Sequence, residues 1–138
     1  MSVNQLLYKD EYFKIVGAAM EVHNILGCGF TEVIYQEAFE NELLLRNIPY
    51  IREKTFKVRY KGILLDKVFR TDFVCYNKII VELKAVSILT KECYSQLYNY
   101  LKASELKLGI LINFGLVSLE TKRIPCTQKW NQSDFSTD

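Results

Sequence analysis

Three charged residues stand on two stretches of the chain that otherwise read as β-strands. Asp72 lies within the strand-like run Val68–Tyr76, and Glu82 and Lys84 interrupt the apolar run Ile79–Ala85. Residues two apart in a strand point to the same face, so Glu82 and Lys84 share one face. The simplest interpretation is a solvated face on which Lys84 pairs with one of the acids.

A different interpretation follows if Asp72 faces the same way as Glu82. Two anions about 4 Å apart repel by roughly 4 kcal/mol at an effective dielectric constant of about 20. A cation between the acids, or a proton on one of them, relieves that repulsion. Lys84 offsets part of it and a divalent ion offsets more, because carboxylate oxygens suit Mg²⁺ or Mn²⁺.

The register of the two strands decides between these interpretations. A three-residue loop at Tyr76–Lys78 places Asp72 directly opposite Glu82, and other even registers also keep the two on one face. A two-residue turn at Asn77–Lys78 puts them on opposite faces unless a bulge corrects the pairing. The metal hypothesis therefore predicts an even register or a bulge.

The elements that must position these residues follow from hydrophobic periodicity and turn signals. We expect one domain over residues 1–125 and a polar tail over 126–138. Thr31 and Thr90 are the expected N-caps of the second and third helices. The predicted fold class is α/β (α+β), a mixed sheet flanked by helices. The expected helices cover 8–26, 31–46 and 90–103, and the expected strands cover 50–60, 68–76, 79–85, 108–114 and 118–124.

Composition excludes several classes of protein. Of the 138 residues, 49% are apolar and 25% are charged, which is the balance of a globular domain. No run reaches the roughly 18 apolar residues of a membrane span, and the first residues are too polar for a signal peptide. Four cysteines without a CxxC pair, beside the lone His23, argue against zinc and favour free thiols in the cytoplasm.

The charged trio and its order on the elements resemble the PD-(D/E)xK nuclease superfamily. More specifically, the chain resembles the small GxxExxY proteins, because Gly29, Glu32 and Tyr35 stand at the spacing of that motif. The stretches VELKAV, QLYNYLKA and GILINFG are also similar, and the resemblance covers about residues 10–125. It implies a restriction-endonuclease-like fold with the core order αβββαβ. Thr71 replaces the proline of the superfamily name.

The resemblance also implies roles for particular residues. Asp72 and Glu82 match the acidic metal ligands, and the backbone carbonyl of Leu83 is the implied third ligand. Lys84 matches the lysine that positions or activates the attacking water. The remaining matches are Glu32, which would assist metal binding from the first core helix, and Gln96, a polar residue near the site. The implied cofactor is Mg²⁺ or Mn²⁺.

Three functions remain open at this point. The first is a metal-dependent nuclease that hydrolyses phosphodiester bonds of DNA or RNA. The second is a non-catalytic module that keeps the nuclease fold and binds nucleic acid or protein, and the third is a hydrolase of small phosphoesters. A domain of this size has little chain for separate substrate recognition, so a homodimer or a partner would be needed to grip a duplex.

Several other residues have both a structural and a functional interpretation. His23 is either a hydrogen-bonded residue near a helix end or a phosphate contact, and Tyr35 either fixes Glu32 or belongs to the core. We expect the tyrosines at 94, 98 and 100 to be core or core-edge residues. The basic run of Lys54, Lys57, Arg59 and Lys61 is an ordinary solvated face or follows a nucleic-acid backbone.

Overall fold

Three helices flank the sheet in the computed structural model, which describes residues 7–127. The helices are α2 (Lys9–Leu26), α3 (Glu32–Leu45) and α4 (Lys91–Ser104), all within about two residues of their predicted bounds. Thr31 and Thr90 occupy the predicted N-cap positions, but neither side chain makes a capping hydrogen bond. Most of the predicted tail, from residue 128 onward, lies outside the described residues.

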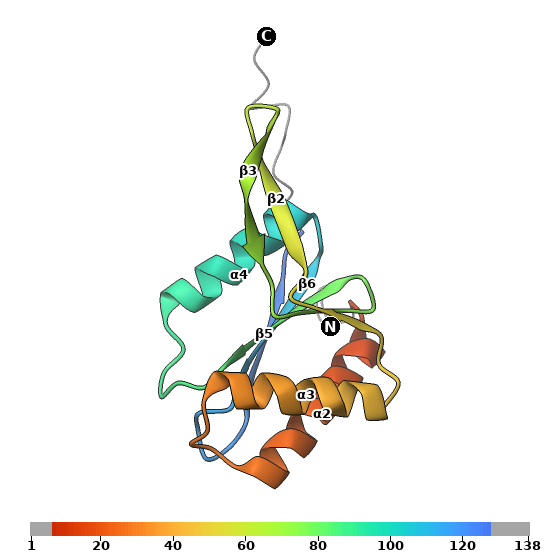
Figure 1. Ribbon diagram of the computed structural model, residues 1–138, viewed down its shortest axis with the longest axis vertical. Helices are drawn as coiled ribbons and strands as arrows, with labels where there is room; N and C mark the ends of the chain where they lie inside the picture. The colour runs from red at the N-terminus through yellow and green to blue at the C-terminus, as the bar shows by residue number, and fades with distance from the viewer. Residues whose placement is uncertain (1–6, 128–138) are drawn as a thin grey trace.

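A five-stranded mixed sheet forms the centre of the fold, as predicted (Figure 1). Its strand order is β1-β4-β5-β6-β7, and only β5 and β6 run parallel. The bounds are β1 Tyr50–Arg52, β4 Phe73–Cys75, β5 Ile79–Lys84, β6 Leu108–Asn113 and β7 Glu120–Pro125.

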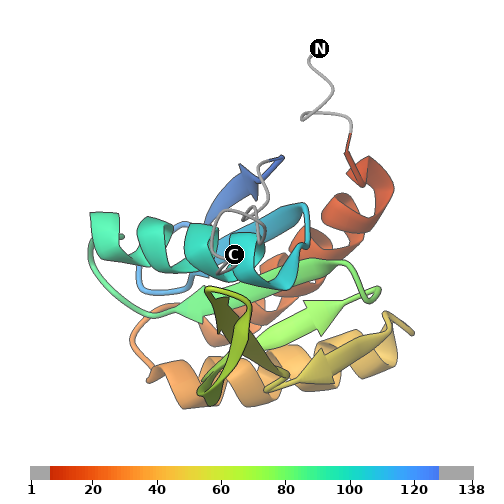
Figure 2. The same ribbon diagram turned by 90° about the horizontal axis from the view of Figure 1, so that it is seen from above.

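The two faces of the sheet are covered by different helices (Figure 2). Successive side chains of a strand alternate between faces, and β5 shows this clearly. Val81 and Leu83 pack in the cluster formed with α2 and α3, whereas Ile80 packs with Leu97 and Leu101 of α4. Burying each such side chain contributes about 1.5–3 kcal/mol. Asp72, Glu82 and Lys84 continue the alternation on the α4 face, just beyond this packing.

One long hairpin supplies strands to two sheets, which corrects the predicted bounds. The single strands expected over 50–60 and 68–76 are wrong, because each is divided into two. β2 (Thr55–Tyr60) and β3 (Ile63–Arg70) pair in a separate ribbon that projects from the body in Figure 1.

The two halves of this hairpin nevertheless share one register. Tyr50 pairs with Cys75 before the bend, and Thr55 pairs with Arg70 after it, so no residue is gained or lost between them. Backbone hydrogen bonds from Glu53 N–H to Asp72 and from Thr71 N–H to Lys54 continue through the bend. Glu53 adopts φ 57°, a left-handed conformation that alternation of residue types does not reveal.

The segment after Lys84 is held by a polar clamp on the neighbouring strand. Asn113 is fully buried, and its side chain accepts from Val86 N–H at 3.0 Å and donates to Val86 O at 2.9 Å. Its Oδ1 also accepts from Gly115 N–H at 3.0 Å. These bonds satisfy the amide group and fix where the chain leaves β5.

The sequence predicts free thiols and no membrane-spanning segment. All four cysteines lie within the described residues, and none of them is joined in a disulfide. Cys126, at the start of the predicted tail, is buried, and its N–H donates to Lys107 O.

Between residues 7 and 127, none of the helices combines the length and the hydropathy that crossing a membrane requires.

We predict that Gly115→Ala lowers the free energy of unfolding by about 3 kcal/mol. A Cβ atom at this position would lie 2.4 Å from both the N and the O atoms of Val86, which are backbone atoms that cannot turn away. Urea denaturation measures the loss. Gly17→Ala is the matched control, because its Cβ would meet only Arg46 Nη1 at 3.4 Å and the helix should gain about 1 kcal/mol. Equal stability of Gly115→Ala and wild type would refute the clamp.

Candidate active site

Asp72 and Glu82 lie opposite each other at the end of the β4–β5 pairing. Phe73 pairs with Val81 and Cys75 pairs with Ile79, so the connection is the three-residue loop Tyr76–Lys78. The even register that the metal hypothesis requires is therefore confirmed. Tyr76 and Asn77 make the turn with φ values of 56° and 59°.

Each of the two acids accepts a backbone N–H from the segment that carries the other. Asp72 N–H donates to Glu82 Oε2 at 2.6 Å, and Leu83 N–H donates to Asp72 Oδ2 at 2.8 Å. The β4–β5 ladder ends at Phe73, where the hairpin bends away, so these carboxylates take the place of backbone acceptors. The exchange holds both carboxyl groups within one small region of the sheet edge.

Burial of this pair disfavours negative charge on it. Glu82 is only 6% exposed, and burial, with the neighbouring Asp72 charge, raises the pKa of Glu82 to about 8. Burial also raises the pKa of Asp72, although the Leu83 N–H and the Lys84 charge oppose that shift. Near neutral pH the pair therefore favours keeping a proton when no cation is near.

Lys84 and Glu32 complete the electrostatic surroundings of the pair. Lys84 is half-buried on the Glu82 face of β5, and its charge lowers the pKa of all three acids against the effect of burial. Glu32 is the first residue of α3, and burial, reinforced by the Asp72 charge, raises its pKa. Its Oε1 accepts a hydrogen bond from Gln36 Nε2 at 3.3 Å.

Tyr35 anchors the loop before α3 and thereby helps to position Glu32, the first residue of that helix. Its hydroxyl donates to Gly27 O at 2.6 Å and accepts from Phe30 N–H at 3.3 Å, and its ring stacks on Phe114 with centroids 4.6 Å apart. Gly29 in this loop has φ 113°, which suits only glycine. The observed bonds support the core interpretation of Tyr35, which orders the loop rather than the Glu32 carboxylate.

His23 likewise has a structural contact. Its Nε2 donates to Leu116 O at 2.9 Å, and its ring lies against Phe114 with centroids 6.1 Å apart. The side chain is 7% exposed and fastens the end of α2 to the β6–β7 connection. These contacts favour the structural interpretation over a phosphate contact.

The two remaining predicted residues lie in different surroundings. The Leu83 side chain is buried in the core, but its N–H points toward Asp72. Since the N–H and C=O of one strand residue point to the same edge, the Leu83 carbonyl also faces that edge. Lys84 O instead accepts from Phe114 N–H on the β6 side. Gln96 is exposed on α4.

The donor set fits a hard divalent cation. The buried Glu82 carboxylate, the half-buried Asp72 carboxylate and a backbone carbonyl offer oxygen ligands, which Mg²⁺ and Mn²⁺ prefer, and a cation would offset the burial and the Asp72 charge that raise the pKa of Glu82. Within residues 7–127, no group of three His, Cys, Asp or Glu side chains is arranged to hold a metal. A metal at this site would thus depend on the Leu83 carbonyl and on water for its remaining ligands.

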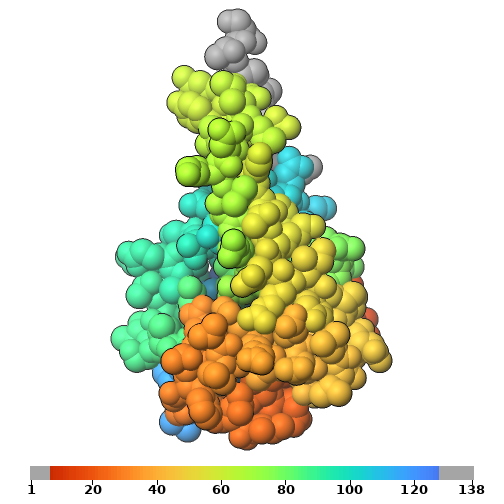
Figure 3. All heavy atoms as spheres, viewed as in Figure 1, coloured from red at the N-terminus to blue at the C-terminus, as the bar shows by residue number. Residues whose placement is uncertain are grey.

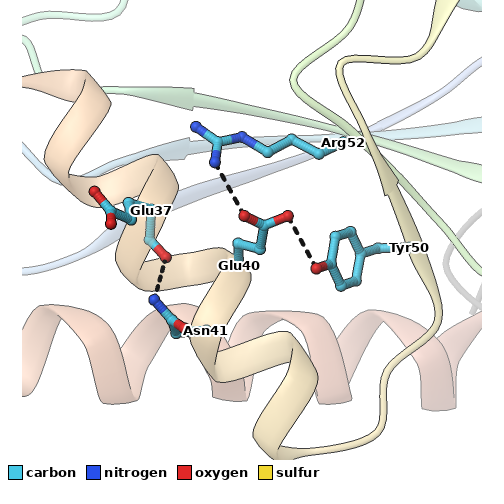
Figure 4. Close-up of polar contacts among 5 residues, drawn as sticks. All are labelled: Glu37, Glu40, Asn41, Tyr50 and Arg52. Carbon is cyan, nitrogen blue, oxygen red and sulfur yellow. Dashed lines mark hydrogen bonds and ion pairs between the residues drawn. The ribbon is translucent and has the colours of Figure 1, made fainter.

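Sequence reasoning missed residues that surround the site. Glu40 of α3 accepts from Arg52 Nη1 at 3.0 Å and from the Tyr50 hydroxyl at 2.9 Å (Figure 4). This contact fastens α3 to β1, and the Arg52 charge lowers the pKa of Asp72. Tyr100 of α4, predicted as a core-edge residue, is half-buried, and its pKa is raised by burial and then by the charges of Glu82 and Asp72.

A recess opens where these elements meet. Figure 3 shows it between α3, α4 and the base of β3. Glu32 begins α3, Tyr100 stands on α4, and Asp72 follows β3 by two residues. A substrate reaching the acids from this side would meet Lys84 and the carboxyl groups together.

Comparison with known proteins agrees with this arrangement. The profile of the family described as the PD-(D/E)XK nuclease superfamily matches residues 9–124. The crystal structure of SSO0001 superposes with a TM-score of 0.57 at 17% sequence identity, over 95% of this chain. The chain spans 65% of the length of that protein, and the similarity concerns the fold. No curated protein matches the sequence.

We predict that Glu82→Gln stabilises the metal-free protein at pH 9 but hardly at pH 5. The pKa of Glu82 rises from 4.5 to about 8 on folding, so between these values the folded state holds a proton that the unfolded state has lost. The free energy of unfolding therefore falls as pH rises from 4.5 to about 8. Each pKa unit between the two values corresponds to about 1.4 kcal/mol, so the loss amounts to a few kcal/mol. A glutamine at position 82 carries no charge at any of these pH values, so the variant avoids this loss of stability.

Urea denaturation in EDTA at pH 5, 7 and 9 measures this difference. Glu37→Gln on the exposed side of α3 is the control and should follow the wild-type pH profile. A constant difference between Glu82→Gln and wild type at all three pH values would contradict the raised pKa.

Proposed function

Since the chain belongs to the PD-(D/E)XK nuclease superfamily, we propose that it is a divalent-metal-dependent nuclease that hydrolyses phosphodiester bonds. The observation that carries the proposal is the pair of Asp72 and Glu82 beside Lys84, in which Glu82 accepts from Asp72 N–H and Asp72 accepts from Leu83 N–H. Structural ion pairs are common, but two adjacent acids with raised pKa values are typical of a functional site.

The finer family assignment is to the GxxExxY proteins. Gly29, Glu32 and Tyr35 support it, because the first makes a left-handed turn, the second places an acid near the site and the third anchors the loop between them. In this proposal residues 1–125 form a single nuclease domain and 126–138 a polar tail. It acts in the cytoplasm, where the thiols stay reduced, and dimerisation would extend its surface for substrate.

The proposed roles are metal binding, orientation of the attacking water and contact with the substrate. Asp72, Glu82 and the Leu83 carbonyl would hold Mg²⁺ or Mn²⁺, with Glu32 assisting from α3. Such an ion, when bound, lowers the pKa of coordinated water and neutralises phosphate oxygens. Lys84 would orient the attacking water and add positive charge near the phosphoryl oxygens. Gln96 would contact substrate from α4, which agrees with its exposure.

The chain's own groups also prepare the site. The Leu83 N–H fixes one oxygen of Asp72, and the Asp72 N–H fixes one oxygen of Glu82, so each carboxylate keeps its other oxygen available. Burial on the sheet edge excludes water from their inner sides and strengthens every charge interaction there. A proton kept by the pair near neutral pH would leave when a cation binds.

We predict metal-dependent cleavage that Asp72→Asn and Lys84→Ala each reduce roughly 100-fold or more, the cost of losing one group that stabilises charge in the transition state. Labelled single- and double-stranded DNA and RNA, incubated with Mg²⁺, Mn²⁺ or EDTA, give the readout. Glu37→Gln and Lys122→Ala, at exposed positions, should keep wild-type activity.

The other two functions are outcomes of the same experiment. Binding of nucleic acid without cleavage, unaffected by Asp72→Asn, would replace the nuclease proposal with the non-catalytic module. Cleavage of a small phosphodiester with all polymers left intact would point to the small-substrate hydrolase.

A second prediction concerns the metal itself and needs no activity. At a concentration 100 times its dissociation constant, Mn²⁺ should raise the free energy of unfolding by about 2.7 kcal/mol. Calorimetric melting with and without Mn²⁺ measures the effect, which should vanish in Asp72→Asn and persist in Glu37→Gln. A shift of equal size in Asp72→Asn would mean that the ion binds elsewhere.

A further inference from the structure

The β2–β3 ribbon projects from the body, and among the described residues its base packs on α4 (Figure 1). Phe56 stacks on Phe69 with centroids 5.4 Å apart, and Phe69 stacks on Tyr100 of α4 at 4.3 Å. Beyond this stack nearly every residue of β3 is exposed (Figure 1). An isolated two-stranded ribbon buries little and is marginally stable, so its length calls for a function.

The ribbon concentrates the positive charge of the protein. Residues 54–70 contain six of the 18 Lys and Arg but only one of the 16 Asp and Glu. The segment therefore carries a net charge of +5, and the rest of the chain, by subtraction from +2, carries −3. A local excess of this kind attracts a polyanion and steers it to the surface that carries it.

Three of the six positive charges, those of Lys57, Arg59 and Arg70, lie on the face of the ribbon opposite the aromatic stack, whereas Lys54 Nζ lies 5.6 Å from the centroid of the Phe56 ring. Lys57 alternates with Phe56 on β2, Arg59 stands two residues further along, and Arg70 faces Thr55 across the ribbon. The same face exposes Val68, opposite Lys57, and Leu64, opposite Arg59; their exposed fractions are 50% and 46%. The register shifts between these two pairs, and Asp66 lies in that stretch of β3. We call this set the basic face.

The basic face leads directly into the acid pair. Arg70 precedes Asp72 by two residues, and Lys54 O accepts from Thr71 N–H at 2.9 Å and from its Oγ1 at the same distance. An anionic polymer lying along the ribbon would thus have one end at the carboxylates and Lys84. The ribbon from Arg70 to the turn spans roughly 25 Å at 3.3 Å per residue.

We propose that the ribbon is the substrate grip of the nuclease and that it holds double-stranded DNA. The inference rests on the proposed function, since it takes nucleic acid as the substrate. A two-stranded ribbon fits the major groove of B-form DNA, where Lys and Arg reach phosphates or guanine and apolar side chains meet thymine methyl groups. The basic face offers both kinds of group.

Duplex RNA and single strands fit this surface less well. The major groove of A-form RNA is too narrow for side chains to read, and single strands are gripped by aromatic platforms. On the ribbon, Phe56 and Phe69 are occupied in the stack with Tyr100. A span of roughly 25 Å corresponds to about seven base pairs at 3.4 Å each, so the substrate must extend about that far to one side of the cleaved bond.

The test compares two double charge reversals in EDTA, where no cleavage occurs. Lys57→Glu with Arg59→Glu changes the basic face, and Lys14→Glu with Lys122→Glu makes the same change of net charge at exposed positions on α2 and β7. Fluorescence anisotropy with a labelled 20-base-pair DNA duplex measures affinity at several salt concentrations, and unfolding curves verify that both variants fold.

We expect the ribbon variant to bind duplex DNA roughly 10–100-fold more weakly. The slope of log affinity against log salt concentration should also be shallower, by the amount that about two lost phosphate contacts produce. The control should bind within about two- to threefold of wild type, and wild type should prefer duplex DNA to duplex RNA and to single strands. The grip would be overturned if the two variants bound duplex DNA with equal affinity, or if wild type bound duplex RNA as tightly as duplex DNA. It would also be overturned if the ribbon variant lost self-association but kept its affinity for DNA.

Failure of the grip and failure of the nuclease assignment give different results. Ribbon-dependent DNA binding with no cleavage in Mg²⁺ or Mn²⁺ supports the grip and overturns the catalytic proposal. Cleavage of duplex DNA at equal rates by both charge-reversal variants supports the nuclease and overturns the grip. A duplex cut as fast with two base pairs beyond the bond as with ten would also overturn it.

Discussion

A buried and a half-buried carboxyl group share the edge of the central sheet, and the cost of placing two negative charges there explains much of what surrounds them. Asp72 and Glu82 remain side by side because each accepts a backbone N–H from the segment that carries the other, and because Lys84 lies nearby. These contacts offset only part of the cost, since the pKa of Glu82 still rises to about 8. The site is thus prepared for a positive charge that the protein itself does not fully supply.

Several distant contacts keep that arrangement in place. Asn113 fixes the chain after Lys84, Tyr35 sets the start of α3 and therefore Glu32, and Glu40 ties α3 to β1. None of these three residues takes part in the proposed chemistry. Their common effect is to prevent the elements around the acids from moving apart, which favours a preorganised site.

The sequence predicted the three helices, the mixed sheet and the register that brings Asp72 opposite Glu82, because periodicity and loop length carry that information. It did not predict the bend at Glu53, since a left-handed residue inside a strand pattern leaves alternation intact on both sides. The contacts of Glu40 and Asn113 join residues far apart in the chain, so no local pattern reveals them. The exposed position of Gln96 depends on how α4 lies on the sheet, which a helical pattern alone leaves open.

The unbroken hydrogen bonding through the bend links two parts of the molecule mechanically. Glu53 N–H donates to Asp72 O and Thr71 N–H donates to Lys54 O, so the base of the ribbon and this acid lie on one continuous hydrogen-bonded ladder. A displacement of the ribbon's base would therefore also move the backbone that carries the carboxyl group. Recognition and hydrolysis would then not be separable parts, and grafting a foreign ribbon onto this scaffold would also alter the catalytic geometry.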